Sequence, residues 1–212
     1  DNITITAVNK AGGYAGLHDP ISSYAVKENK ILNTTIIVDN YAGGIYGELK
    51  TYDNGITATS ITDNIVQANV VANQTGAGGL VGQFQSSRNA AGGNNSILAR
   101  NIILPYRQET SSIYSSGDAG ALIGEFTGIN NAEPGILNNE KNGSNILFTD
   151  VQGTASGITT GNTNLDDRFD NLMVHNSFKL NGTFPESTSI HKVNKALDPE
   201  EDSLQNRELY TG

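Results

Sequence analysis

The chain contains no cysteine and no tryptophan, and its 212 residues include only three histidines and five prolines. The absence of cysteine excludes a disulfide framework and any thiolate metal site. The three histidines are scattered and form no HExxH pattern, and no Gly-x-Ser-x-Gly phrase marks a serine nucleophile. We therefore predict no catalytic residues from motifs.

Charge is also sparse, because Asp, Glu, Lys and Arg make up only 17% of the chain and leave a net charge of -9. The thirteen basic residues are dispersed, which excludes a nucleic-acid partner because phosphate binding needs clustered Lys and Arg. No apolar run approaches the roughly 18 residues that span a bilayer, so we predict no transmembrane segment.

What the chain has in abundance is glycine, with 24 residues, together with many Asn, Thr and Ser. Gly, Asn and Thr lower helix propensity, whereas Thr, Val and Ile suit strands. This composition predicts an all-β protein with many turns. The first residues, 1 to 8, already alternate as a strand, and no signal segment precedes them, so we expect the chain to be part of a longer protein.

One short glycine phrase occurs four times, with the pattern Ala-Gly-(Gly/Ala)-x-x-Gly. The first glycines stand 31, 35 and 42 residues apart, which is room for one unit of several short strands. Such a period is typical of stacked repeats rather than of a centrally packed globule. The copies are Ala11–Gly16, Ala42–Gly47, Ala77–Gly82 and Ala119–Gly124.

Strand-like segments precede the second, third and fourth copies, and turn-rich stretches separate the units. We expect long turns at 51–64, 85–97 and 127–145, which absorb the growing spacing while the strands keep register. In a solenoid such insertions collect on one face, which is often the binding face.

The phrase Gly78-Gly79-Leu80-Val81-Gly82, with its variants at 43–47 and 120–124, resembles the GLUG repeat of bacterial surface and secreted proteins. That family includes adhesins and the amino-terminal regions of streptococcal immunoglobulin A1 metallopeptidases. The resemblance covers roughly residues 1 to 160. It implies a right-handed β-solenoid-like stack of about four to five repeats in a large extracellular or cell-surface protein.

The residue after each last glycine is polar in the later copies, and the next residue is apolar. If the repeats stack, Glu48, Gln83 and Glu125 form a column that we expect to face solvent, and they are our candidate ligand-binding residues for a glycan or Ca²⁺. The neighbouring positions, Leu49, Phe84 and Phe126, should point into the core. His18 takes the corresponding place in the first copy, where we expect an edge residue.

Residues 161–212 contain no copy of the phrase, and we interpret them as a capping or linking segment after a repeat domain at 1–160. Within them, Asp166, Asp167 and Asp170 gather carboxylates in a way that superficially resembles a calcium loop. The segment lacks the glycine and the closing glutamate of an EF-hand, and the same residues suit the start of a helix. No cofactor is predicted, and Ca²⁺ is the one ion that the pattern admits.

These observations favour a noncatalytic module of an adhesin-like protein at the bacterial cell surface or in the extracellular medium. It would act as a stalk or as a region that binds a glycan or a host-cell ligand. Two enzyme-related alternatives stay open, a solenoid that acts on polysaccharides and an accessory domain of a secreted peptidase. A β-barrel carrier for a small apolar ligand is a further alternative.

Overall fold

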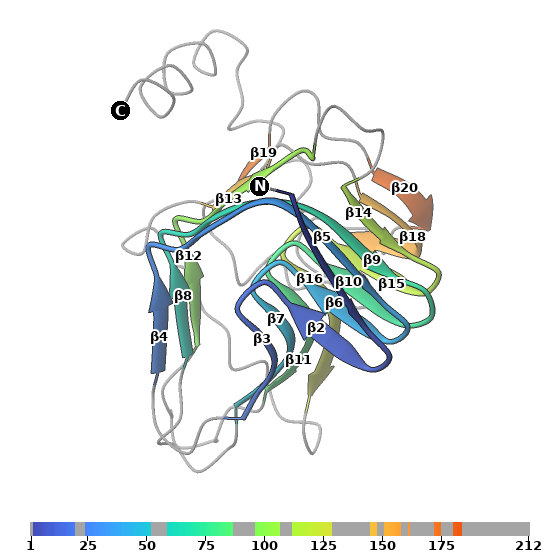
Figure 1. Ribbon diagram of the computed structural model, residues 1–212, viewed down its shortest axis with the longest axis horizontal. Helices are drawn as coiled ribbons and strands as arrows, with labels where there is room; N and C mark the ends of the chain where they lie inside the picture. The colour runs from blue at the N-terminus through green and yellow to red at the C-terminus, as the bar shows by residue number, and fades with distance from the viewer. Residues whose placement is uncertain are drawn as a thin grey trace, which may run out of the picture.

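In a computed structural model the chain folds into three parallel β-sheets that wind around one axis as a β-solenoid (Figure 1). The structure describes residues 2–19, 24–51, 59–86, 96–106, 112–128, 145–147, 151–157, 161, 172–174 and 180–183. Within these residues all regular structure is β-strand. None of the described residues belongs to a helix of the length and apolarity that crossing a membrane requires. The predicted all-β class and the stacked repeats are therefore confirmed.

Each coil contributes strands to the three sheets in the same order. The first coil has β1 (Ile3–Ala7), β2 (Lys10–Gly12), β3 (Ala15–His18) and β4 (Tyr24–Lys27). The second has β5 (Lys30–Val38), β6 (Tyr41–Gly43), β7 (Tyr46–Thr51) and β8 (Thr59–Thr62). The third has β9 (Ile65–Ala72), β10 (Gly76–Gly78), β11 (Val81–Ser86) and β12 (Ile97–Ala99).

The fourth coil has β13 (Ile102–Leu104), β14 (Ile113–Ser115), β15 (Asp118–Gly120) and β16 (Ile123–Gly128). Four later strands continue the stack: β17 (Asn145–Leu147), β18 (Val151–Gly157), β19 (Leu172–Val174) and β20 (Leu180–Thr183). β19 pairs with β17, and β20 pairs with β18, so parallel stacking reaches beyond residue 160.

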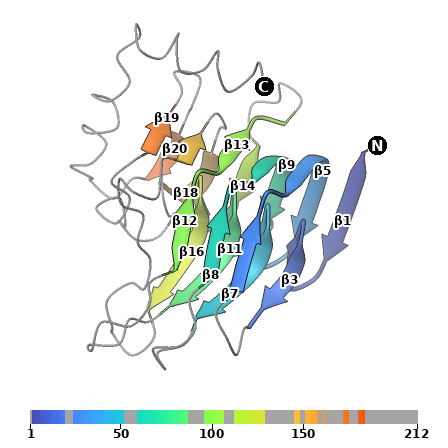
Figure 2. The ribbon, with the colours of Figure 1, turned by 90° about the vertical axis from the view of Figure 1, so that its left-hand side faces the viewer.

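The coils stack in sequence order from the N-terminal coil onward (Figure 2). The 13-stranded sheet contains the first two strands of each of the first three coils, the first three strands of the fourth coil, and β17 to β20. The four-stranded sheet contains β3, β7, β11 and β16, and the three-stranded sheet contains β4, β8 and β12. Because only the first three coils have a strand in the three-stranded sheet, about three turns include all three walls, slightly fewer than the four to five repeats predicted. Every pairing among the described strands is parallel and belongs to a solenoid stack, so these strands do not form the closed barrel that the carrier alternative requires.

The four glycine phrases occupy equivalent positions of successive coils, as predicted. Gly12, Gly43, Gly78 and Gly120 are consecutive neighbours in register across β2, β6, β10 and β15. The last glycine of each phrase is the second residue of its strand in the four-stranded sheet, and it permits a close approach of two backbones there. A Cβ on Gly82 would lie 2.6 Å from the carbonyl oxygen of Gly47 and 2.7 Å from the amide nitrogen of Ala42. Because backbone atoms cannot move aside, only glycine fits there.

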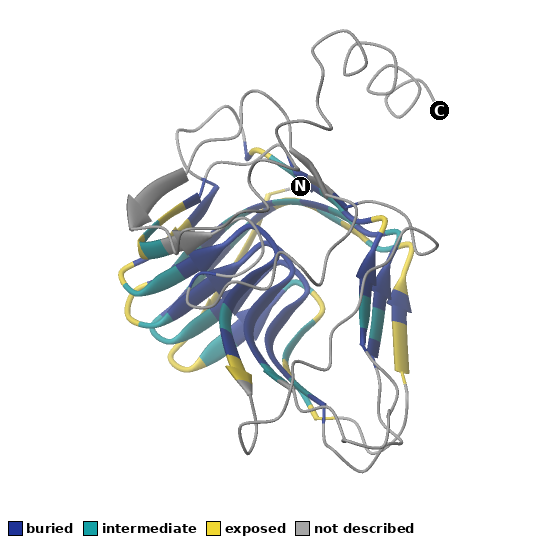
Figure 3. Cartoon of the chain, turned by 180° about the vertical axis from the view of Figure 1, so that it is seen from behind, coloured by how far each residue is buried: buried dark blue, intermediate teal, exposed yellow. Residues whose placement is uncertain are grey.

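The core lies between the walls, and the inward residues of the strands fill it (Figure 3). Alternation produces this burial, since alternate side chains of β9 are buried along its whole length. Leu49, Phe84 and Phe126 are buried register neighbours, and the Phe84 and Phe126 rings meet edge to face at a centroid distance of 6.0 Å. The predicted internal ladder is confirmed.

The third wall was not predicted. Residues 59–62 fall within the turn predicted at 51–64, but they form β8 and pair with β4 and β12. The ends of the predicted turns are also strand, since 51, 85–86 and 127–128 end β7, β11 and β16, and 97 and 145 begin β12 and β17. The stretches 52–58, 87–95 and 129–144 lie outside the described residues. Short strands flanked by turn-forming residues carry too little periodicity to be recognised alone; they become strands because stacking satisfies their backbone groups.

Candidate functional site

The predicted polar column exists. Gln83 of β11 is the register neighbour of Glu48 in β7 and of Glu125 in β16. The prediction that the column faces solvent is wrong, because Glu48 is only 1% exposed and Gln83 only 6% exposed. The column lies against the β2, β6, β10 and β15 strands, which double back through the glycine turns and cover it.

Two lysines neutralise the buried carboxylate of Glu48. The ammonium group of Lys10, from β2, contacts Oε2 directly. The Nζ of Lys50 lies 3.1 Å from Oε1. The Oε1 atom has no directed hydrogen bond, so charge attraction rather than hydrogen-bond geometry holds Lys50 there. A buried carboxylate in this setting is stabilised by its ion partners, and it offers no open face to a ligand.

Gln83 separates the two carboxylates of the column. Its Nε2 donates to the Tyr41 hydroxyl at 2.9 Å and to Oε1 of Glu125 at 3.3 Å, while its Oε1 accepts from Nε2 of Gln85 at 3.0 Å. Burial, with the nearby charge of Glu125, raises the pKa of Tyr41 to about 12. The amide therefore relieves the repulsion expected between stacked carboxylates.

Glu125 completes the column with further internal partners. The Thr127 hydroxyl donates to its Oε1 at 3.1 Å. Burial, and then the charge of Glu125, raises the pKa of the Asp118 carboxyl. Each polar side chain of the column thus has a partner within the stack: two lysines at Glu48, Tyr41 and Gln85 at Gln83, and Gln83 and Thr127 at Glu125.

A second internal ladder was missed in the sequence. Asn29, Asn64, Asn101 and Asn145 follow one another at the corner between the three-stranded and the large sheet, where each precedes or begins a strand of the large sheet. Asn64 is typical, because it donates from Nδ2 to Oδ1 of Asn101 at 2.9 Å and to the carbonyl of Thr62 at 2.9 Å. Its own Oδ1 accepts from the backbone and side chain of Asn29 at 3.0 and 3.1 Å.

The signal for this ladder is visible in hindsight. Each asparagine is followed two residues later by an aliphatic residue, in the phrases Asn29-Lys30-Ile31, Asn64-Ile65-Val66, Asn101-Ile102-Ile103 and Asn145-Ile146-Leu147. Each of the first three is preceded by a non-glycine residue with positive φ, namely Glu28, Asp63 and Arg100 at φ of 60°, 60° and 54°. The left-handed residue turns the corner, and the amide then satisfies the backbone groups that the turn frees.

Aromatic rings cluster around His18 on the first two coils. His18 is at the register position that Leu49, Phe84 and Phe126 occupy in the later coils. The imidazole stacks on the buried Tyr46 ring at 4.9 Å and lies 5.0 Å from the ring of Tyr24. The hydroxyls of Tyr14 and Tyr24 are 2.8 Å apart. Nε2 of His18 and the hydroxyl of Tyr46 are buried without a hydrogen-bond partner, and burial lowers the pKa of His18 and raises that of Tyr46.

The predicted carboxylate cluster of Asp166, Asp167 and Asp170 lies outside the described residues. Within the part of the chain that is described, no group of three or more His, Cys, Asp or Glu side chains is arranged to hold a metal ion. The candidate cation ligands of the column, Glu48 and Glu125, are occupied by the internal partners given above.

Comparison of the chain with protein-family models, with curated proteins and with solved structures finds no match. The inference of function therefore rests on the fold and on the geometry of the two polar ladders.

Proposed function

We propose that this chain is a noncatalytic β-solenoid module of an adhesin-like protein, at the cell surface or secreted, which acts as a stalk and presents ligand-binding turns. The proposal rests on the positions at which the long stretches between the four-stranded sheet and the next strand begin. Thr51, Ser86 and Gly128 are register neighbours at the ends of β7, β11 and β16. In the sequence these three residues are followed directly by the stretches 52–58, 87–95 and 129–144, which therefore all begin at adjacent positions of the four-stranded sheet.

The internal ladders support a passive role for the stack itself. The Glu48 carboxylate is buried and ion-paired, so it is not placed to protonate a glycosidic bond or to activate water. The asparagine amides are bound to one another and to backbone carbonyls. Because the stack holds these groups on partners of its own, we place ligand contacts on the turns that connect its strands.

Two assays test the proposal, a glycan array and a host-cell binding assay. Each uses the full chain and a variant in which short Gly-Ser linkers replace the three stretches. We expect the parent to bind at least one glycan or cell type and the variant to lose this binding with a nearly unchanged thermal midpoint. A matched control replaces only residues 107–111, which lie within the coil that the stretch at 129–144 leaves. Binding that survives the triple replacement contradicts the proposal, as does hydrolysis of a tested polysaccharide that disappears on changing one carboxylate.

A further inference from the structure

Two tyrosines that lead into different walls of the solenoid are in contact. Tyr14 lies between β2 and β3, directly before the four-stranded sheet, and Tyr24 begins β4 of the three-stranded sheet. Their hydroxyl groups share a hydrogen bond of 2.8 Å. Both residues belong to one coil, so the contact is complete within the described residues. It joins two sheets that share no hydrogen-bonded strand pair in the described part of the chain.

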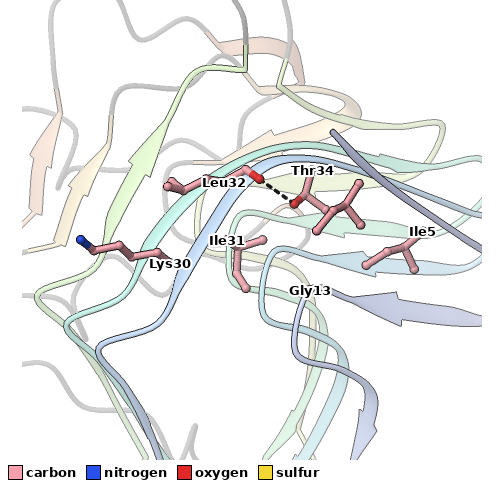
Figure 4. Close-up of a pocket in the computed structure, with 7 residues that line it drawn as sticks. Ile5, Gly13, Lys30, Ile31, Leu32 and Thr34 are labelled. Atoms are coloured by element: carbon pink, nitrogen blue, oxygen red, sulfur yellow. Dashed lines mark hydrogen bonds between the residues drawn. The ribbon is translucent and has the colours of Figure 1, made fainter. Parts of the chain in front are cut away.

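The backbone that carries Tyr14 is fixed by the second coil. The amide of Gly13 donates to the carbonyl of Gly44 at 3.1 Å, and the amide of Tyr14 donates to the carbonyl of Ile45 at 3.0 Å. Gly13 and Ile31 also line a cavity of about 220 Å³ (Figure 4). A Cβ on Gly13 would lie only 2.7 Å from Cγ2 of Ile31, so the chain passes close to that side chain. Tyr14 therefore extends from a backbone that has little freedom to move.

Two further rings hold the two phenol rings in place. Tyr14 meets the buried Tyr46 ring edge to face at a centroid distance of 5.7 Å. The ring of His18 lies 5.0 Å from that of Tyr24 and stacks on Tyr46 at 4.9 Å. Tyr14 and Tyr24 thus pack against one stacked pair of rings, which keeps their hydroxyls together. The hydrogen bond with Tyr24 also raises the pKa of Tyr14, so Tyr14 is a neutral phenol at neutral pH.

The later coils do not repeat this tyrosine pair. In the later glycine phrases the place of Tyr14 is taken by Ile45, Leu80 and Leu122. The register neighbour of Tyr24 in β8 is Thr59. The hydroxyl of Tyr46 is buried without a hydrogen-bond partner, so it takes no part in the contact. Among the four coils that carry the phrase, only the first therefore has tyrosine at both places.

We propose that Tyr14 and Tyr24 are a modification site, at which one-electron oxidation forms a dityrosine cross-link that fastens the four-stranded wall to the three-stranded wall. Each phenol loses one electron and one proton and becomes a tyrosyl radical. The two radicals couple through a ring carbon next to each hydroxyl, and transfer of the two displaced ring hydrogens to the oxygens restores both phenols. The oxidant is hydrogen peroxide, used by a haem peroxidase. It takes up the two electrons and two protons and becomes two molecules of water.

The hydroxyl contact is the arrangement that the product needs. Because the new bond joins carbons adjacent to both hydroxyls, the two oxygens of dityrosine lie side by side, as those of Tyr14 and Tyr24 already do. Holding the reacting groups together favours coupling within one chain over coupling between chains. Like a disulfide, the link also restricts the unfolded chain, so it should stabilise the fold. This proposal does not rest on the ligand-binding turns.

Peroxidase and hydrogen peroxide, applied to a dilute solution of the full chain, test the proposal. Both tyrosines lie in the tryptic peptide 11–27, which follows Lys10 and ends at Lys27. We expect this peptide to lose the mass of two hydrogen atoms and to show dityrosine fluorescence. A second cleavage before Asp19 should leave its two halves joined. The purified cross-linked chain should also have a higher thermal midpoint than the unoxidised chain.

Tyr14→Phe and Tyr24→Phe keep the rings and remove one hydroxyl each, and each should lower the fluorescence about tenfold or more, because no other pair is held in this contact. Tyr114→Phe is the matched control and should behave like the parent, since Tyr114 is an exposed tyrosine of another coil. An unchanged peptide 11–27, a link that involves Tyr46, or covalent dimers alone overturn the proposal. An equal or lower midpoint overturns the fastening role. Glycan binding is measured on the unoxidised chain, so the two proposals fail separately.

Discussion

Nδ2 of Asn64 donates to Oδ1 of Asn101 at a distance of 2.9 Å, one coil further along the stack. Both side chains are fully buried. This amide-to-amide contact joins two coils where the chain passes from the three-stranded to the large sheet, and it repeats between Asn101 and Asn145. The corner of each coil is thereby fixed by the coil after it.

Replacement of Asn64 by alanine should lower the free energy of unfolding by about 2 to 4 kcal/mol, because several buried groups lose their partners at once. Urea denaturation measures the change. Asn73→Ala is the matched control, since Asn73 is exposed and its side-chain amide donates to Oδ1 of Asp39 at the surface. Equal effects of the two substitutions would show that the ladder does not stabilise the corner.

Phe84→Ala should cost about 3 to 5 kcal/mol, because the ring is fully buried between Leu49 and Phe126 and its removal leaves a cavity. Chemical denaturation of the two proteins gives the difference. The exposed Tyr114 serves as the comparison, and Tyr114→Ala should change stability little. A loss below about 1 kcal/mol for Phe84→Ala would mean that the site collapses without cost.

Simultaneous replacement of Lys10 and Lys50 by methionine should destabilise the fold by about 3 to 5 kcal/mol at neutral pH, because it leaves the buried Glu48 carboxylate without an opposite charge. Glu48→Gln should cost less than about 2 kcal/mol, since the column already holds an amide at Gln83. Adding Glu48→Gln to the lysine double variant should then restore most of the loss. Thermal and urea unfolding of the four proteins measure this coupling, and purely additive effects would contradict it.

Gly82→Ala should prevent native folding or cost more than about 3 kcal/mol, because the new Cβ would lie 2.6 Å from the carbonyl oxygen of Gly47. Ala121→Gly tests the third position of the phrase, where the fourth copy already accepts a methyl group, and it should cost only about 1 kcal/mol. Circular dichroism and thermal melts distinguish the two. A well-folded Gly82→Ala protein with a parental midpoint would refute the close approach.

Stability should fall as the pH drops below about 6.5, in part through His18. Burial lowers the pKa of His18 in the folded state, so the unfolded chain binds the proton more readily and acidification favours unfolding. His18→Phe places at this position the residue that Phe84 and Phe126 provide in later coils, and it removes this dependence. The variant's advantage in thermal midpoint over the parent should therefore widen from pH 8 to pH 5.5. A constant difference across that range would exclude His18 as the titrating group.

The sequence by itself determined the class of fold and the order of the repeats. The glycine phrases specify where two backbones meet, and alternation at β5 and β9 specifies which residues are inside, because both constraints are local and recur with the coil. The pairing of Glu48, Gln83 and Glu125 followed from that recurrence alone.

Only the tertiary structure decided whether that column is open or covered. Whether Glu48 meets solvent depends on where Lys10 and Tyr41 lie, and those residues belong to strands that fold back over the column through the glycine turns. The asparagine ladder also depends on tertiary contacts. An asparagine before a strand is compatible with many turns, and only the next coil supplies the partner of its side chain. Local residue chemistry fixed the repeat, whereas burial and partners depended on contacts between segments 35 or more residues apart, which no single repeat contains.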